Sequence, residues 1–126
     1  MYKPDQYNAV SPYLVVTGAQ QVIDFLKDVF EATDLRRYET PGGSIMHAEV
    51  RIEDSVIMIG EAGENWPATP THLHVYVRDV DEVYQRALEA GAQSVQAPER
   101  KGEDPDRRGG IKGPGGNTWW ISTQEA

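Results

Sequence analysis

The sequence contains no cysteine, so it can form neither a disulfide nor a thiolate metal site, and a reducing cytoplasm is its expected location. It has no apolar run near the roughly 18 residues that a membrane span needs, and its first residues lack a signal-peptide pattern. Basic residues are scarce: 12 Lys and Arg against 20 Asp and Glu give a net charge of -8. We therefore expect neither nucleic acid nor membrane as a partner.

The length of the chain is enough for one domain, residues 1–126, whose hydrophobic core needs no disulfide or structural metal for stability. Its patterns repeat the order strand, helix, strand, strand, strand. A shift of about 61 residues lays Tyr13 on His74 and Val22 on Val83, a repeat of pattern rather than of identity. The sequence predicts an α+β fold of two paired βαβββ modules, 10–62 and 70–123, that form a curled, partly open sheet with helices on its convex face.

In the first module, apolar residues at helical spacing predict a helix from about 19 to 31. The hairpin of 45–52 and 56–60 turns at Glu53-Asp54 with Ile52 opposite Ser55. That register puts His47, Glu49 and Arg51 on one face, which we expect to line a solvent-filled cavity. The opposite face, expected under the helix, carries Met46, Ala48, Val50, Ile52, Ile57 and Ile59.

In the second module, Asp79 is a good N-cap for a helix that runs to about residue 90 and ends at Gly91. Short strands are expected over 92–97, 110–112 and 118–122. Residues 98–109 read as a charged, flexible loop, in which Arg107-Arg108 either binds an anionic group over the cleft or stays solvated.

The strand 72–77 alternates polar and apolar side chains, so His72, His74 and Tyr76 share one face. Two imidazoles and a phenol are poor material for a dry core but suit the wall of a small-molecule pocket. We expect the strand that begins near Tyr13 to supply the matching wall. On the last strand, Trp119 and Trp120 must face opposite ways, with Trp120 toward the cleft, as a stacking platform or as simple filling.

Several motifs, in this order and at this spacing, resemble the vicinal oxygen chelate superfamily of glyoxalase I, bleomycin-resistance proteins and extradiol dioxygenases, and its PhnB-like single-domain members in particular. The resemblance implies paired βαβββ modules, a cleft inside the curled sheet and a homodimer. The motifs are Pro12-Tyr13-Leu14 to Val22-Ile23-Asp24-Phe25, His47-Ala48-Glu49, Asp54 to Met58, Val77 to Asp81, Ala90-Gly91-Ala92 and Gly113 to Gly116.

The resemblance also implies four metal-ligand positions, which here hold Ser11, Met58, His72 and Trp120. Only His72 is a competent ligand for a borderline divalent cation, which prefers imidazole and carboxylate. We therefore expect no cofactor at the family's usual metal site.

The alternative is a shifted metal site in which His72 and Glu49 combine with His47 or His74 to hold zinc, nickel, manganese or iron. A second alternative uses Glu49 and His47 as a metal-free general-base pair. In the third, these polar side chains bond to each other, to water or to an organic ligand.

The leading hypothesis is a protein that binds or sequesters a small organic molecule in the cleft between the modules, as bleomycin-resistance proteins do. The ligand-binding residues would be Tyr13, His47, Glu49, Met58, His72, His74, Tyr76 and Trp120. The alternatives are a metal-dependent lyase, isomerase or dioxygenase and a domain whose work is protein association.

Overall fold

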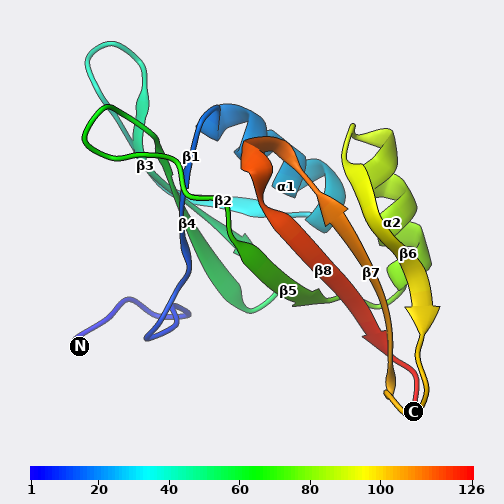
Figure 1. Cartoon of the computed structure of the whole chain (residues 1–126). Helices are drawn as coiled ribbons and strands as arrows, with labels where there is room; N and C mark the ends of the chain where they lie inside the picture. Colours follow the sequence, from blue (N-terminus) through cyan, green and yellow to red (C-terminus); the bar gives the residue numbers. More distant parts are fainter. The chain divides into compact units, whose positions relative to one another are not determined.

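The computed structural model describes all residues, 1–126, and the chain forms two compact units, Met1–Thr69 and Pro70–Ala126 (Figure 1). Each unit has the order strand, helix, strand, strand, strand, and each strand set forms one open four-stranded mixed sheet. The predicted α+β class and the βαβββ modules are confirmed. Neither helix is long and apolar enough to cross a membrane.

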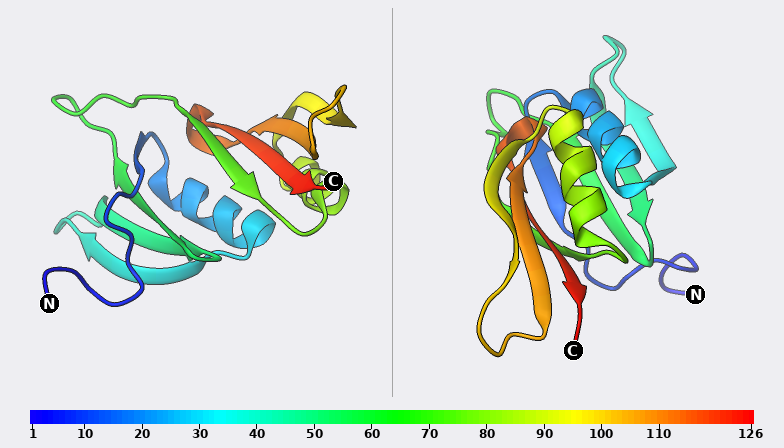
Figure 2. Two further views of the ribbon diagram at one scale, coloured as in Figure 1. Left: turned by 90° about the horizontal axis from the view of Figure 1, so that it is seen from below. Right: turned by 90° about the vertical axis from the view of Figure 1, so that its right-hand side faces the viewer.

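Unit 1 builds its sheet in the order β1-β4-β3-β2, with β1 parallel to β4 and the other pairs antiparallel. The helix covers one face of this sheet (Figure 2), because its apolar stripe packs on β1, β3 and β4. The elements are β1 (Tyr13–Val16), α1 (Ala19–Phe30), β2 (Thr33–Glu39), β3 (Ile45–Ile52) and β4 (Ser55–Glu61).

The β3–β4 hairpin has the predicted register, with Ile52 opposite Ser55, Val50 opposite Ile57 and Glu49 opposite Met58. Glu53 takes a left-handed conformation (φ 50°) in the turn. Since the side-chain period of a strand is two, this register fixes which residues lie under α1 and which lie on the helix-free face.

Met46 is an exception to the predicted apolar face, because it is 60% exposed. Tyr38 pairs with His47 but Glu39 pairs with Ile45, so β3 carries one extra residue at Met46. This bulge reverses the alternation of side chains, so that Ile45 is buried in the core and Met46 faces solvent.

Unit 2 has the order β5-β8-β7-β6, with β5 parallel to β8. Asp79 caps the helix as predicted, since its carboxylate accepts the backbone N–H of Glu82 over 3.1 Å, and Gly91 (φ 99°) follows the helix end. The elements are β5 (His72–Tyr76), α2 (Val80–Glu89), β6 (Gln93–Arg100), β7 (Asp106–Lys112), a 3-10 turn (Pro114–Gly116) and β8 (Thr118–Gln124).

The prediction of a flexible loop over residues 98–109 is wrong. Strand β6 continues to Arg100 and β7 begins at Asp106, which leaves only a short turn between them. Pro98 is tolerated because β6 is the edge strand of its sheet and the register shifts beside it. The guanidinium of Arg107 makes a bidentate interaction with the Asp81 carboxylate, with both N–O distances at 2.9 Å, so it is not free to move over a cleft.

Candidate functional site

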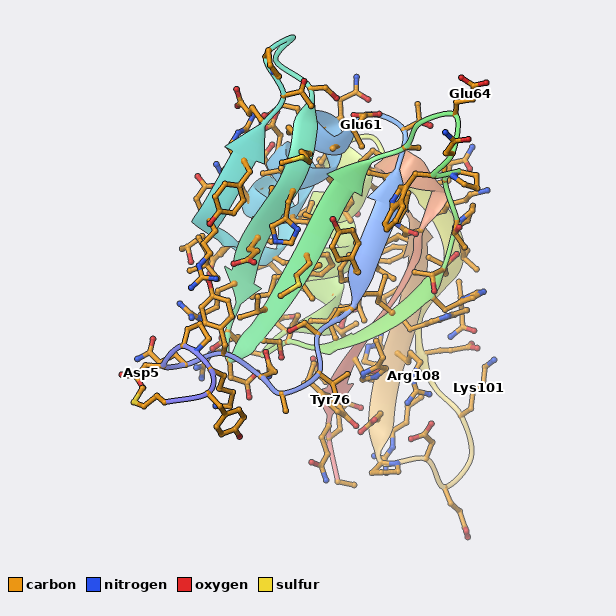
Figure 3. The ribbon with its side chains drawn as sticks, turned by 90° about the vertical axis from the view of Figure 1, so that its left-hand side faces the viewer. Asp5, Glu61, Glu64, Tyr76, Lys101 and Arg108 are labelled. Atoms are coloured by element: carbon orange, nitrogen blue, oxygen red, sulfur yellow. The ribbon has the colours of Figure 1, made fainter.

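The helix-free face of unit 1 carries the polar side chains that the sequence placed there. Tyr13, Met58 and Glu49 are lateral neighbours on β1, β4 and β3, and His47 lies two residues before Glu49. Figure 3 views this sheet from that side, with α1 behind it. Gly60 leaves room for the phenol of Tyr13, because a Cβ there would lie 3.0 Å from its oxygen.

Glu49 is the buried centre of this face, only 4% exposed. Its Oε2 lies 2.7 Å from Nε2 of His47, and its Oε1 accepts the hydroxyl of Tyr7 over 2.6 Å. Burial raises the pKa of Glu49, but the hydrogen bonds from His47 and Tyr7 outweigh it and hold the pKa below its usual range. Glu49 is therefore an ionised carboxylate with a donor on each oxygen.

The ionised carboxylate fixes one proton of His47. Because Glu49 can only accept, Nε2 of His47 must carry hydrogen. Nδ1 of His47 lies 3.2 Å from the hydroxyl oxygen of Tyr13. In the neutral ring, Nδ1 accepts the hydrogen bond that this hydroxyl donates. Burial, with the charge of Glu49, raises the pKa of Tyr13, so the phenol keeps its proton. The result is a continuous chain from Tyr13 through His47 and Glu49 to Tyr7.

Aromatic rings surround His47 on the same face. Its ring centroid lies 5.4 Å from that of Tyr13 and 6.1 Å from that of Tyr38. Trp66 meets Tyr13 edge to face at 6.1 Å and is 54% exposed. These rings give the face an apolar border around a hydrogen-bonded centre, the usual composition of a small-molecule site.

Unit 2 has a second polar network on its own helix-free face. Nε2 of His74 lies 2.9 Å from the hydroxyl oxygen of Ser122, which also accepts Nε–H of Arg108 over 3.0 Å. Ser122 is fully buried, so His74 Nε2 is the acceptor for its hydroxyl hydrogen. Burial, then the positive charge of Arg108, lowers the pKa of His74, which favours the neutral ring that this bond requires.

Tyr76 closes this network rather than standing free. Its hydroxyl donates to Asp106 Oδ2 over 2.7 Å, and Arg108 donates to the same oxygen over 3.2 Å. Figure 3 places Tyr76 and Arg108 close together. The bond to Asp106 raises the pKa of Tyr76. The ring of Tyr76 remains 58% exposed and lies edge to face with His74 at 4.6 Å, so it offers an aromatic surface.

The two tryptophans of β8 face opposite ways, as predicted. Trp119 is buried, whereas Trp120 is partly exposed on the helix-free face beside His72. The indole Nε1–H of Trp120 donates to Nδ1 of His72 over 3.1 Å.

The side chains at the family's four ligand positions do not fit a divalent cation. Ser11, Met58 and Trp120 offer a hydroxyl, a thioether and an indole, and the Nδ1 lone pair of His72 accepts from Trp120. Within either unit, no three His, Asp or Glu side chains are grouped to hold a metal. The shifted set of His72, Glu49 and His47 draws on both units and stays a prediction. To ligate a metal, His47 would have to give up its contact with Tyr13 or with Glu49, because both of its ring nitrogens are occupied.

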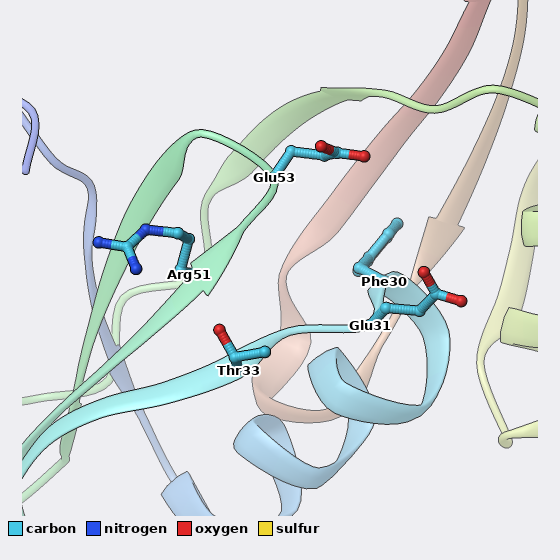
Figure 4. A pocket seen from close by; sticks show the side chains of 5 residues that line it. All are labelled: Phe30, Glu31, Thr33, Arg51 and Glu53. Atoms are coloured by element: carbon cyan, nitrogen blue, oxygen red, sulfur yellow. The ribbon is translucent and has the colours of Figure 1, made fainter. Parts of the chain in front are cut away.

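An open pocket of about 250 Å³ lies elsewhere in unit 1, where α1 ends near the β3–β4 turn (Figure 4). The lining side chains do not converge: Arg51 points away from Glu31 and Glu53. This pocket shares none of the predicted site residues. It is lined by Phe30, Glu31, Thr33, Arg51 and Glu53.

Sequence reasoning missed Tyr7, Ser122 and Asp106 as members of the two networks. Tyr7 lies in an arm without periodicity, so no pattern marked it. The internal repeat does not mark the other two either, because a shift of about 61 residues lays Ser122 on Glu61 and Asp106 on Ile45.

Comparison with known proteins gives concordant results. The family model for the glyoxalase/bleomycin resistance protein/dioxygenase superfamily matches residues 5–121. The uncharacterized protein Rv0887c of Mycobacterium tuberculosis is 37% identical over 124 residues, 90% of this chain and 72% of that protein.

TioX and TnmS3 are two of the solved structures that share the fold. TioX from Micromonospora sp. ML1 has a TM-score of 0.73 at 24% identity, covering 92% of this chain and 99% of its own. TnmS3, an antibiotic binding protein from Streptomyces sp. CB03234, has a TM-score of 0.71 at 18% identity, covering 94% and 99%.

Proposed function

Because the chain belongs to the glyoxalase/bleomycin resistance protein/dioxygenase superfamily, we propose that it binds a small organic molecule on the helix-free faces of its sheets, without a divalent metal. The observation that carries the proposal is the exposure of aromatic rings around a hydrogen-bonded centre on these faces. Tyr13 is 41% exposed beside the His47–Glu49 pair, and Tyr76 is exposed beside His74. Such rings bind flat organic molecules through area burial and stacking.

Two further points support binding. At the family's metal-ligand positions, this chain carries the side chains of an organic-ligand site, with Met58 and Trp120 in place of cation ligands. One of the proteins of the same fold, TnmS3, is an antibiotic binding protein. Proteins of one fold can have many functions, so the proposal depends on the residues of the site rather than on the fold. A homodimer and a cytoplasmic location complete the proposal.

A second candidate is proton transfer by His47 without a metal. The specific observation is the 2.7 Å contact of its Nε2 with buried Glu49, which orients the ring. A ligand hydroxyl that displaces Tyr13 would donate its proton to Nδ1, and Glu49 would stabilise the imidazolium that forms. A metal-dependent lyase, isomerase or dioxygenase with His72, Glu49 and His47 as ligands has less support, because both ring nitrogens of His47 already hold hydrogen bonds.

The experiment is a tryptophan-fluorescence screen of planar drugs and metabolites against the purified protein in chelator-containing buffer. We expect saturable quenching by at least one planar compound, since Trp66 and Trp120 both have exposed surface on these faces. A screen in which no compound quenches would contradict binding. Quenching that proceeds equally after His47→Gln would show that binding does not need the imidazole, whereas the proton-transfer candidate requires that His47→Gln abolish turnover of the bound compound.

A further inference from the structure

The rings of His72 and Trp120 lie side by side in nearly one plane. Their planes differ by 9° and their centroids are 6.3 Å apart. The indole N–H lies in the plane of the indole and the Nδ1 lone pair lies in the plane of the imidazole, so the 3.1 Å bond between them joins the rings edge to edge. Together they make one flat surface, which we call the His72–Trp120 plate.

The sheet beneath holds the plate flat. Gly110 on β7 is the lateral partner of Trp120, and a Cβ there would lie 2.6 Å from Cζ3 and 2.8 Å from Cε3 of the indole. The benzene part of the indole therefore lies directly on the backbone at Gly110, and only glycine permits this approach. With one face on the sheet, the exposed surface of Trp120 and His72 is the other face.

The first unit shows that this plate is not a requirement of the fold. A shift of about 61 residues lays Glu49 on Gly110, and Met58 takes the place of Trp120 as its lateral partner. In unit 1 a carboxylate and a thioether occupy these positions. In unit 2, glycine and indole replace them, which removes a charged group and adds a flat ring.

The chemistry of the plate indicates its occupant. An indole presents a negative face, which attracts cations and electron-poor rings. The chain has a net charge of -8, which adds a general attraction for cations. The plate spans an indole and an imidazole, so a single small ring would cover only part of it.

We propose that the His72–Trp120 plate binds a planar, fused-ring aromatic cation by stacking. This inference rests on the proposed function and names the class of ligand at one part of that site. The lone pair of His72 that a metal would use is committed to Trp120, so stacking on the plate and metal binding through His72 Nδ1 exclude each other.

The first test needs no ligand. In nitrogen–proton NMR spectra, we expect the indole N–H of Trp120 to exchange slowly with water and the neutral ring of His72 to carry its proton on Nε2. The indole N–H of exposed Trp66 serves as the reference within the same chain. If the N–H of Trp120 exchanges as fast as that of Trp66, the plate is not formed and the inference fails, whatever the protein binds.

The second test compares 9-aminoacridine, a three-ring cation, with 4-aminopyridine, a one-ring cation, by isothermal titration calorimetry. We expect 9-aminoacridine to bind at least about tenfold more tightly, the scale of stacking on an aromatic side chain. Gly110→Ala should weaken its binding about tenfold by lifting the indole off the sheet. The control is Gly63→Ala, because a Cβ at Gly63 meets no atom within 4 Å.

Two further variants keep the test decisive if Gly110→Ala does not fold. Trp120→Phe removes the N–H and part of the surface, and His72→Gln removes the second ring; both should weaken 9-aminoacridine binding. Unchanged binding in both would overturn the plate while leaving the proposed function intact. If 9-aminoacridine does not bind but a neutral planar compound from the fluorescence screen does, the cation class is overturned alone. If nothing binds in either experiment, both proposals fail.

Discussion

Nε2 of His47 and Oε2 of Glu49 face each other at 2.7 Å on one strand, and Glu49 is almost fully buried. Residues two apart on a strand share a face, so the alternation of β3 alone brings these two groups together. A charge that is buried in this way is tolerated because both of its oxygens accept hydrogen bonds, one of them from Tyr7. The N-terminal arm thus helps to hold the centre of the candidate site.

The first prediction concerns the arm. Tyr7→Phe should lower the free energy of unfolding by about 1 to 2 kcal/mol at pH 7, because a buried carboxylate loses one of its two donors. Urea denaturation measures the change. Tyr2→Phe is the matched control, since Tyr2 is exposed and its hydroxyl makes no hydrogen bond within the chain, and it should have almost no effect. Equal effects of the two substitutions would contradict the role given to Tyr7.

The second prediction is the pH dependence that Glu49 produces. Its pKa in the folded protein is lowered from the ordinary 4.5, so its contribution to stability is complete above pH 4.5 and is lost as the pH falls through the folded value. The difference in unfolding free energy between the wild type and Glu49→Gln should therefore shrink as the pH is lowered from 7 to 3. A difference that stays constant with pH would show that folding does not shift the pKa of Glu49, and a difference that grows as the pH falls would show a raised pKa.

The third prediction concerns His74. Its pKa is lowered from 6.5, first by burial and then by Arg108, so the folded protein prefers the neutral ring. Stability should be full above pH 6.5 and should fall as the pH drops through the folded pKa. NMR titration of the imidazole resonances measures the pKa directly. A value above 6.5 would contradict both the bond from Ser122 and the sign of this effect.

The fourth prediction tests how unit 1 holds its helix. The carboxylate of Glu61, at the end of β4, accepts the backbone N–H groups of Gly18 and Ala19, each over 2.9 Å, so it caps α1 from another strand. Glu61→Gln should lower the free energy of unfolding by about 1 kcal/mol, the usual scale of a cap. Glu64→Gln is the control, because Glu64 is exposed and nearby (Figure 3). If both substitutions change the thermal unfolding temperature equally, Glu61 does not stabilise α1 as a cap.

The sequence predicted the fold well where periodicity carries the information. The hairpin register followed from turn length and alternation, and the structure has Val50 opposite Ile57 as expected. The same logic failed at Met46, because a single bulge in β3 reverses the alternation and no residue type marks it. It failed again over 98–109, where charge and Pro98 suggested a loop. An edge strand tolerates both.

The candidate site was predictable only in part. Alternation correctly grouped His47 with Glu49, and His72 with His74, on helix-free faces. The partners of these groups come from segments far away in the sequence: Tyr7 is 42 residues from Glu49, and Ser122 is 48 residues from His74. No local pattern encodes such pairs. The pair of Ser122 and His74 follows from the register between β5 and β8, and the pair of Tyr7 and Glu49 follows from the path of the N-terminal arm; both are known only once the fold is known.

The most direct test of metal-free binding is calorimetric titration of the best ligand from the fluorescence screen, with the protein first in EDTA and then with equimolar zinc, nickel, manganese or iron(II). Metal-free binding predicts the same dissociation constant in every buffer and a larger one after Trp120→Phe. Binding that appears only when a metal is added, and that His72→Gln abolishes, would contradict it.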